Sequence, residues 1–171
     1  MHALRTCLSI IDKMNEWVAK VMSWAIIFII GSTAYEVILR YVFSAPTEWS
    51  FELNYLLNGA YFLLLGAYTF AVRGHVNVDI FYARFSPRKQ AIIDLFTAPL
   101  FFFFISMMFI FGGQFALQSL AYRETLSSAW APPIYPVKLV IPVAAAMLIL
   151  QGLAKFIRDL HTALTGRKDE L

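Results

Sequence analysis

A pair of opposite charges stands in the stretch YEVILRYVF (residues 35–43), which is otherwise apolar. Glu36 and Arg40 are four positions apart, so a helix places them on one face, with the glutamate first, the better order for an ion pair. A carboxylate in a membrane span can act as a proton carrier, but not while an arginine neutralises it. We therefore interpret the pair as structural. Either Arg40 reaches the lipid headgroups with Glu36 as its counter-charge, or the two form a polar clamp that fixes a helical hairpin or a protein contact.

Two further carboxylates follow a short turn at residues 44–47. Thr47 is a plausible N-cap for the next helix, and Glu48 and Glu52 would then lie in its first turn, where they favour the helix dipole. On this interpretation Arg40 could bridge carboxylates from two helices. The first two apolar stretches of the chain are thus predicted to form a hairpin.

A polar stripe is predicted on the second of these helices. Asn54, Asn58 and Tyr61 recur at spacings of four and three, and Gly59 and Gly66 would let another helix approach closely. This stripe is expected to face protein and not lipid. Packing inside the bundle and contact with an external partner explain it equally well.

Candidate metal and haem ligands are few. His75 and Asp79 lie four apart in a short loop, but two ligands without a third make a weak site, and a hydrogen-bonded turn is the favoured interpretation. His2, His75 and His161 all lie outside the apolar stretches, which disfavours haem binding inside them. With the single cysteine, Cys7, no disulfide is possible within the chain. We find no nucleotide-binding loop and no nucleophile with a base, and expect neither an enzyme nor a cofactor.

The composition is that of a membrane protein, with 60% hydrophobic and only 15% charged residues. We predict an all-α membrane protein forming a single integral membrane domain over residues 1–171. Four stretches have the length needed to cross a bilayer. They are residues 21–43, 51–72, 99–121 and 137–157.

Two amphipathic segments, residues 3–19 and 87–98, are predicted to form interfacial helices on the cytoplasmic face. Ser86 and Pro87 are typical of a helix start. For residues 87–98 the alternative is one long tilted helix that continues through a kink at Pro99. A second kink is expected at Pro142.

The basic residues indicate the orientation of the four spans. Eleven of the fourteen lysines and arginines fall on one side, which predicts that both termini are cytoplasmic (N-in/C-in). These eleven are Arg5, Lys13, Lys20, Arg73, Arg84, Arg88, Lys89, Lys155, Arg158, Arg167 and Lys168. Because they are scattered singly, the net charge of +3 does not indicate nucleic-acid binding. Trp49, Trp130 and Tyr135 fall near the outer interface, as in an aromatic belt.

The loop before the fourth span, SSAWAPPIYP (residues 127–136), contains three prolines that stiffen it. Trp130, Pro133 and Tyr135 belong to this loop. A rigid loop on the outer face suits a docking surface.

Three stretches together resemble a known family, the small membrane subunit (Q component, DctQ-like) of tripartite ATP-independent periplasmic (TRAP) transporters. The stretches are EVILRYVFSAPTEWSFEL, LLGAYTFAVRGHVNVDIFYARFS and WAPPIYPVKLVIPVAAAMLILQG. Their order and spacing around four helices span nearly the whole chain. One departure is Tyr135, which stands where the family often has tryptophan.

The resemblance implies a subunit of a sodium-driven, binding-protein-dependent importer of organic acids such as dicarboxylates or sialic acid. Its partners would be a large membrane subunit, a periplasmic substrate-binding protein and the lipids of the bacterial inner membrane. The resemblance further implies that the small subunit is a scaffold, which packs against the large subunit and helps to receive the binding protein. Sodium and solute would bind to the large subunit, so no substrate, metal or catalytic residue is assigned here. Eleven structural or partner-contact candidates remain: Glu36, Arg40, Trp49, Glu52, Asn54, Asn58, His75, Asp79, Trp130, Pro133 and Tyr135.

Two rival functions come from other classes. A small homodimeric exporter would use Glu36 as its exchanged carboxylate, and a membrane anchor of an oxidoreductase would carry haem. Four spans without an inverted repeat lack the usual midplane site of a secondary transporter, which favours a passive role beside a larger subunit.

Overall fold

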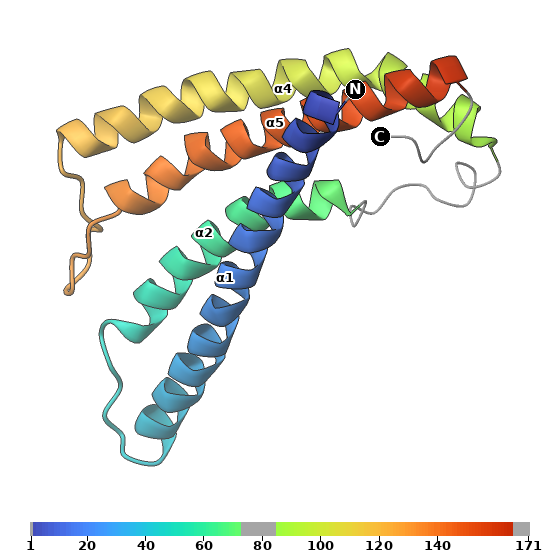
Figure 1. The fold of residues 1–171 in the computed structure, drawn as a ribbon. Helices are drawn as coiled ribbons and strands as arrows, with labels where there is room; N and C mark the ends of the chain where they lie inside the picture. Colours follow the sequence, from blue (N-terminus) through green and yellow to red (C-terminus); the bar gives the residue numbers. More distant parts are fainter. Residues whose placement is uncertain (1, 73–84, 166–171) are drawn as a thin grey trace.

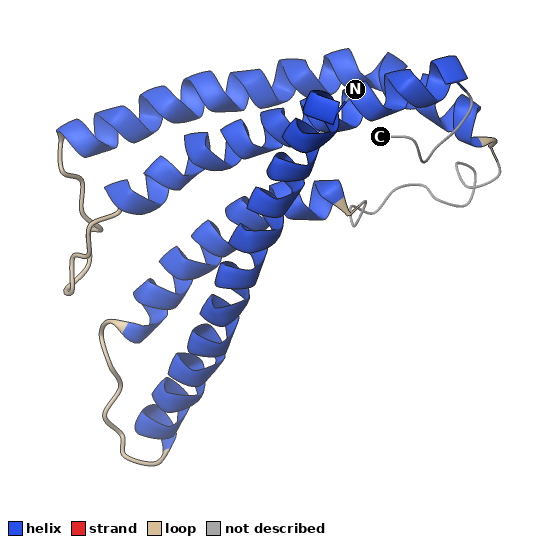
Figure 2. Ribbon diagram, viewed as in Figure 1, coloured by secondary structure: helices blue, strands red, loops and turns tan. Residues whose placement is uncertain are grey.

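The structure is a computed structural model that describes residues 2–72 and 85–165. In these residues the chain forms four helices, coloured in Figure 2. Their bounds are α1 (His2–Tyr41), α2 (Ser50–Ala71), α4 (Pro87–Ala121) and α5 (Tyr135–Thr165). An isolated antiparallel bridge between Thr125 and Pro133 is the only β-type pairing in the described ranges.

The helices form two arms, each a pair of neighbouring antiparallel helices (Figure 1). α1 packs along α2, and α4 packs along α5. The arms meet where α2 and the N-terminal part of α1 contact α5. The start of α1 and the end of α5 lie on one side of the molecule, whereas the loops of residues 42–49 and 122–134 lie on the other.

α1 is one continuous helix of 40 residues, so the predicted surface helix over residues 3–19 and the first predicted span are a single element. No proline occurs before Pro46, so nothing in the sequence breaks the helix near residue 20. The helix ends after Tyr41, where Ser44 adopts a left-handed backbone (φ 51°) and the Ala45 N–H donates to the Leu39 carbonyl. A left-handed residue just after the last turn is a common way to end a helix, and this bond satisfies one of the last carbonyls of α1.

α4 is also continuous, with Pro99 inside its 35 residues. Of the two predictions for residues 87–98, the structure contains the long helix and not a separate interfacial one. It begins at Pro87 with Ser86 as N-cap, as predicted, although the Ser86 side chain makes no capping hydrogen bond. α5 likewise continues through Pro142.

Three helices are long and apolar enough to cross a membrane: α1 from Thr6 to Tyr41, α4 and α5. α2 has sufficient length, with 22 residues, but Glu52, Asn54 and Asn58 lower its hydropathy. Three of the four predicted spans are thus supported by length and composition. The fourth predicted span, residues 51–72, does not meet this criterion.

The α4–α5 contact is close because small residues line it. Ala145 and Ala154 of α5 are completely buried. Beside them Gly152 faces the ring of Phe101 from α4, which in turn stacks on Phe70 of α2 with ring centroids 4.8 Å apart. Three helices therefore meet around one aromatic ring.

We expect Gly152→Ala to lower the free energy of unfolding by about 1–3 kcal/mol through overpacking. A Cβ at position 152 would lie 2.5 Å from Cε1 of Phe101, and the stacked Phe70 ring limits how far Phe101 can move away. The midpoint of thermal unfolding of the detergent-purified chain measures this. The matched control is Gly59→Ala, where a Cβ would meet nothing within 4 Å and alanine is the better helix former. Equal midpoints for the two variants would contradict the close packing.

Candidate functional site

Glu36 is the hydrogen-bonding centre of the α1–α2 hairpin. Its Oε1 accepts from Arg40 Nη2 at 2.7 Å and from Nε at 3.2 Å. Its Oε2 accepts from the Thr47 backbone N–H at 3.1 Å and also from the Thr47 hydroxyl. The carboxylate is buried, whereas half of the Arg40 side chain is exposed. One acid thus joins the last turn of α1 to the loop that leads into α2.

Two details of the predicted hairpin are wrong. Trp49, half-buried, occupies the N-cap position of α2 instead of Thr47, because the Thr47 hydroxyl already donates to Glu36. Arg40 does not bridge carboxylates of two helices among the described residues, since both of its bonds go to Glu36. The bridging group is the acid and not the arginine.

The predicted polar stripe of α2 divides between two environments. Asn54 bonds to α1 through Ser32 Oγ, which donates to its Oδ1 at 2.6 Å, and through its Nδ2, which donates to Thr33 Oγ1 at 3.2 Å. Asn58 is exposed and makes no hydrogen bond to the described residues. Tyr61 is half-buried, with its ring edge against Phe62. Internal packing therefore accounts for Asn54 but not for Asn58.

The loop between α4 and α5 is an ordered hairpin. Leu126 N–H donates to the Pro132 carbonyl at 2.9 Å, and Ile134 N–H donates to the Glu124 carbonyl at 3.0 Å. Ala131 takes a left-handed backbone (φ 47°) near its tip. These two bonds connect the two sides of the loop, in addition to the restriction that its prolines place on the backbone.

The candidate docking residues lie on this hairpin. Trp130 is 41% exposed, Pro133 is exposed, and Tyr135 is half-buried as the first residue of α5. Ser128 Oγ donates to Glu52 Oε2 of α2 at 2.8 Å. Glu52 therefore connects the hairpin to the arm formed by α1 and α2.

An ion pair anchors the base of the same hairpin. Lys138 Nζ lies 2.5 Å from Glu124 Oε2 and 4.1 Å from the centroid of the Phe115 ring. The Ser119 hydroxyl donates to the same carboxylate oxygen at 2.6 Å. The hydrogen bonds from Lys138 and Ser119 hold the pKa of Glu124 below its ordinary value.

We expect Glu124 to make the hairpin acid-sensitive. Because its folded pKa is lowered, its contribution to stability is complete above the unfolded value near 4.5 and is lost as the pH falls through the folded pKa. The fluorescence of a variant that keeps Trp130 but has phenylalanine at Trp17, Trp24 and Trp49, followed from neutral pH to acid, reports on the loop. Glu124→Gln should remove the fluorescence change that the wild type shows below the ordinary glutamate pKa. Glu48→Gln, in the loop of residues 42–49, should keep that change. Identical titration curves for the two variants would show that Glu124 does not make the hairpin acid-sensitive.

A buried polar network, not predicted from the sequence, lies where α1 crosses α5. Asn15, completely buried, donates through Nδ2 to Gln151 Oε1 at 2.6 Å, and Gln151 Nε2 donates to Asp12 Oδ1 at 3.0 Å. Arg158 Nη2 lies 2.6 Å from Asp12 Oδ2. The sequence does offer a signal, because Asn15 and Gln151 are amides that share a helix face with a charged residue, Asp12 and Arg158 respectively. Their pairing depends on the fold.

A second unpredicted cluster ties α4 to α5. Lys155 Nζ bonds to Asp159 Oδ2 at 2.7 Å, one turn along α5, and to Asp94 of α4. All three side chains are largely buried. The spacing of Lys155 and Asp159 is visible in the sequence, whereas their contact with Asp94 is not.

These polar groups join one helix to another. Among the described residues, no group of three His, Cys, Asp or Glu side chains is placed to hold a metal ion. The candidates His75 and Asp79 lie outside the described residues. Three long helices apolar enough to cross a membrane define the class as a polytopic helical membrane protein.

Comparison with known families specifies the class further. Residues 29–162 match the family described as tripartite ATP-independent periplasmic transporters, DctQ component. The chain belongs to this family, which confirms the resemblance found in the sequence. It is a small membrane component of a TRAP transporter. No individual curated protein matches the sequence.

Proposed function

We propose that this chain is the scaffold of a sodium-driven TRAP importer of organic acids, packed against the large membrane subunit and helping to dock the periplasmic binding protein. The match over residues 29–162 carries the proposal, because it includes the Glu36 hairpin, the α4–α5 hairpin and most of the bundle. Sodium and solute would bind to the large subunit. The ion pairs of Glu36 with Arg40 and of Asp12 with Arg158 support a passive role, since each of these carboxylates is already neutralised.

In the proposed arrangement all four helices cross the bacterial inner membrane, with both termini in the cytoplasm. The excess of lysine and arginine on the side of the termini supports this orientation. So does the position of the start of α1 and the end of α5 on one side of the molecule (Figure 1). α2, at about 33 Å for 22 residues, is long enough to cross the hydrocarbon core once other helices cover its polar groups.

Docking of the binding protein is assigned to the α4–α5 hairpin. Trp130 and Pro133 are exposed there on an ordered backbone, so little conformational entropy would be lost on binding. Tyr135 begins α5 directly after the hairpin, and Glu52 fixes the position of the hairpin relative to α2 through Ser128.

The rival exporter function requires Glu36 to be unpaired and available for exchange. In the structure this carboxylate accepts hydrogen bonds from both Arg40 and Thr47. No observation on the described residues favours haem binding. We therefore propose neither an exporter nor an oxidoreductase anchor.

Co-expression with the large subunit and the binding protein tests the proposal. A tag on this chain should recover the large subunit from detergent-solubilised membranes, and proteoliposomes should take up solute only when all three components and a sodium gradient are present. Transport by this chain alone, or failure to recover the large subunit, would overturn the scaffold function.

The docking role is tested separately in the same system. Trp130→Ala should raise the concentration of binding protein needed for half-maximal uptake while leaving recovery of the large subunit unchanged. Trp24→Ala, an exposed tryptophan of α1, is the control. Loss of the large subunit in Trp130→Ala would show instead that the hairpin belongs to the membrane assembly.

A further inference from the structure

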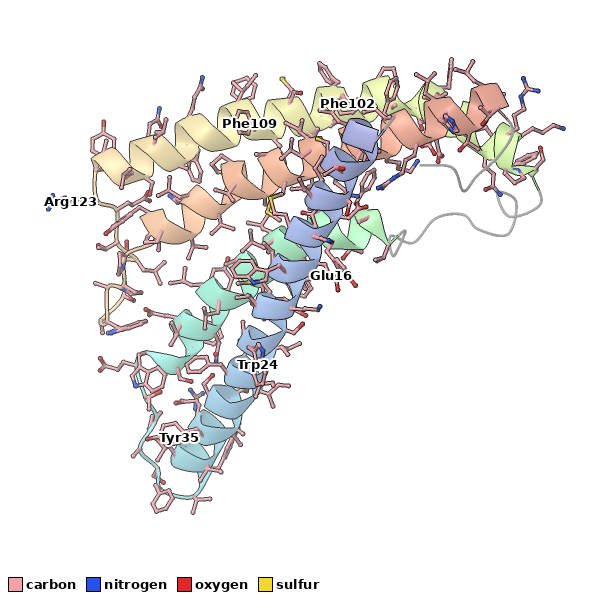
Figure 3. The ribbon with its side chains drawn as sticks, in the orientation of Figure 1. Glu16, Trp24, Tyr35, Phe102, Phe109 and Arg123 are labelled. Atoms are coloured by element: carbon pink, nitrogen blue, oxygen red, sulfur yellow. The ribbon has the colours of Figure 1, made fainter. Side chains whose placement is uncertain are left out.

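The uncovered faces of the helices differ in their suitability for lipid. α1 exposes Trp24 (74%) and Ile30 (63%), and Figure 3 shows Trp24 on α1 and Phe109 on α4 along the outside of the two arms. The exposed hydroxyls of α1, Ser23 and Thr33, donate to carbonyls one turn earlier, at Ala19 and Ile29. Lipid chains can therefore cover these two hydroxyls of α1 without leaving them unsatisfied.

The uncovered face of α2 is different. Phe51 (75% exposed), Tyr55 (69%) and Phe62 (69%) lie along one line of the helix, at spacings of four and seven residues. Asn58 lies on the same line between Tyr55 and Phe62, also exposed, and Gly59 is beside it. We call these five residues the Asn58 face. The other sides of α2 pack on α1 and α5.

The depth of Asn58 makes lipid a poor neighbour. It stands eight residues after the start of α2 and thirteen before its end, which is about 12 Å and about 20 Å along the axis. Its amide, which has two donors and an acceptor, makes no hydrogen bond to the described residues. In hydrocarbon such a group is costly until another helix supplies a partner. By contrast, Asn54 already bonds to Ser32 and Thr33.

We infer that the Asn58 face binds a helix of the large membrane subunit, which presents a hydrogen-bonding side chain to the Asn58 amide. The inference rests on the proposed function and specifies where the partner packs. α2 is the one described helix that fails to qualify as a span by composition, and α1 and α5 shield it on two sides. A partner helix on the third side completes the shielding. Gly59 favours close approach there, because no atom lies within 4 Å of the position that a Cβ would take.

Photo-crosslinking in membranes that contain all three components tests the assignment. A benzophenone amino acid at position 62 is expected to yield an adduct of this chain with the large subunit. The same probe at position 24, on the exposed face of α1, is expected to yield none. An adduct of two copies of this chain from position 62, no protein adduct there, or equal adducts from both positions would each overturn the inference.

Substitution of the amide tests its chemistry. Asn58→Leu is expected to lower recovery of the large subunit about threefold to tenfold, as the loss of one interhelical hydrogen bond in a membrane would. Asn58→Gln should retain most of it. Gln114→Leu is the matched control, because Gln114 is also an exposed amide at a similar distance from a loop end, seven residues, but lies on α4 and outside the Asn58 face. Unchanged recovery in Asn58→Leu, or an equal loss in Gln114→Leu, would overturn the inference.

The wild-type chain separates this inference from the proposed function. If the wild type recovers no large subunit, the scaffold function itself fails. If it recovers the large subunit while Asn58→Leu does so equally well and position 62 gives no adduct, only the assigned face is wrong. The midpoint of thermal unfolding of purified Asn58→Leu should equal that of the wild type, since no described residue bonds to this amide.

Discussion

Lys155→Met is expected to lower the free energy of unfolding by about 2–4 kcal/mol, the largest effect on the isolated chain. The lysine is the cation between Asp94 of α4 and Asp159 of α5, whose side chains are only 18% and 9% exposed. Removing it leaves the carboxylate of Asp94 largely buried without its counter-charge. The value is set below that of a fully buried pair because Lys155 retains 26% exposure and water screens it in part.

The control for this prediction is Lys20→Met. Lys20 lies 2.9 Å from Glu16 on the same helix, with side chains 73% and 51% exposed, so its loss should shift the thermal midpoint little. The double variant Lys155→Met/Asp94→Asn should recover part of the stability, since it removes an uncompensated charge. Equal midpoints for Lys155→Met and Lys20→Met would show that the cluster does not stabilise the α4–α5 pair.

Glu36→Leu is expected to reduce recovery of the assembled transporter severalfold and to reduce uptake in parallel. The substitution removes the acceptor for Arg40 and for both donors of Thr47, so Thr47 in the loop that leads into α2 is no longer held to α1. Because α2 carries the Asn58 face, a misplaced α2 also misplaces the proposed contact with the large subunit. Co-purification and sodium-driven uptake measure the two effects.

Two further variants test whether Glu36 acts as a clamp on Thr47 or only as the counter-charge of Arg40. Glu48→Leu removes an exposed carboxylate of the same loop and should leave assembly unchanged. Arg40→Ala should have an intermediate effect, because Glu36 keeps its bonds to Thr47 but loses its counter-charge. If Arg40→Ala and Glu36→Leu both assemble and transport like the wild type, the arginine only reaches the headgroups and the hairpin needs no clamp.

Much of this protein could be predicted from its sequence because the relevant physics is local. Long apolar stretches indicate helices that suit a bilayer, and the start of α4 at Ser86 and Pro87 follows from capping preferences. The Glu36–Arg40 pair follows from a spacing of four within one helix. The order of motifs along the chain was enough to indicate the family that the comparison confirmed.

Only the tertiary structure decided which polar groups meet. Asp12 and Arg158 are 146 positions apart, and Asn15 and Gln151 are 136 apart, so no helical periodicity relates them. Thr47 was predicted as a cap because threonine is a common N-cap residue, yet the arriving carboxylate of Glu36 takes its hydroxyl. Asn54 and Asn58 belong to the same predicted stripe, and the sequence does not distinguish them. In the structure α1 supplies hydrogen-bond partners to Asn54, whereas Asn58 is exposed. Local propensity determines where a helix forms, whereas the partner of each side chain depends on how distant helices pack.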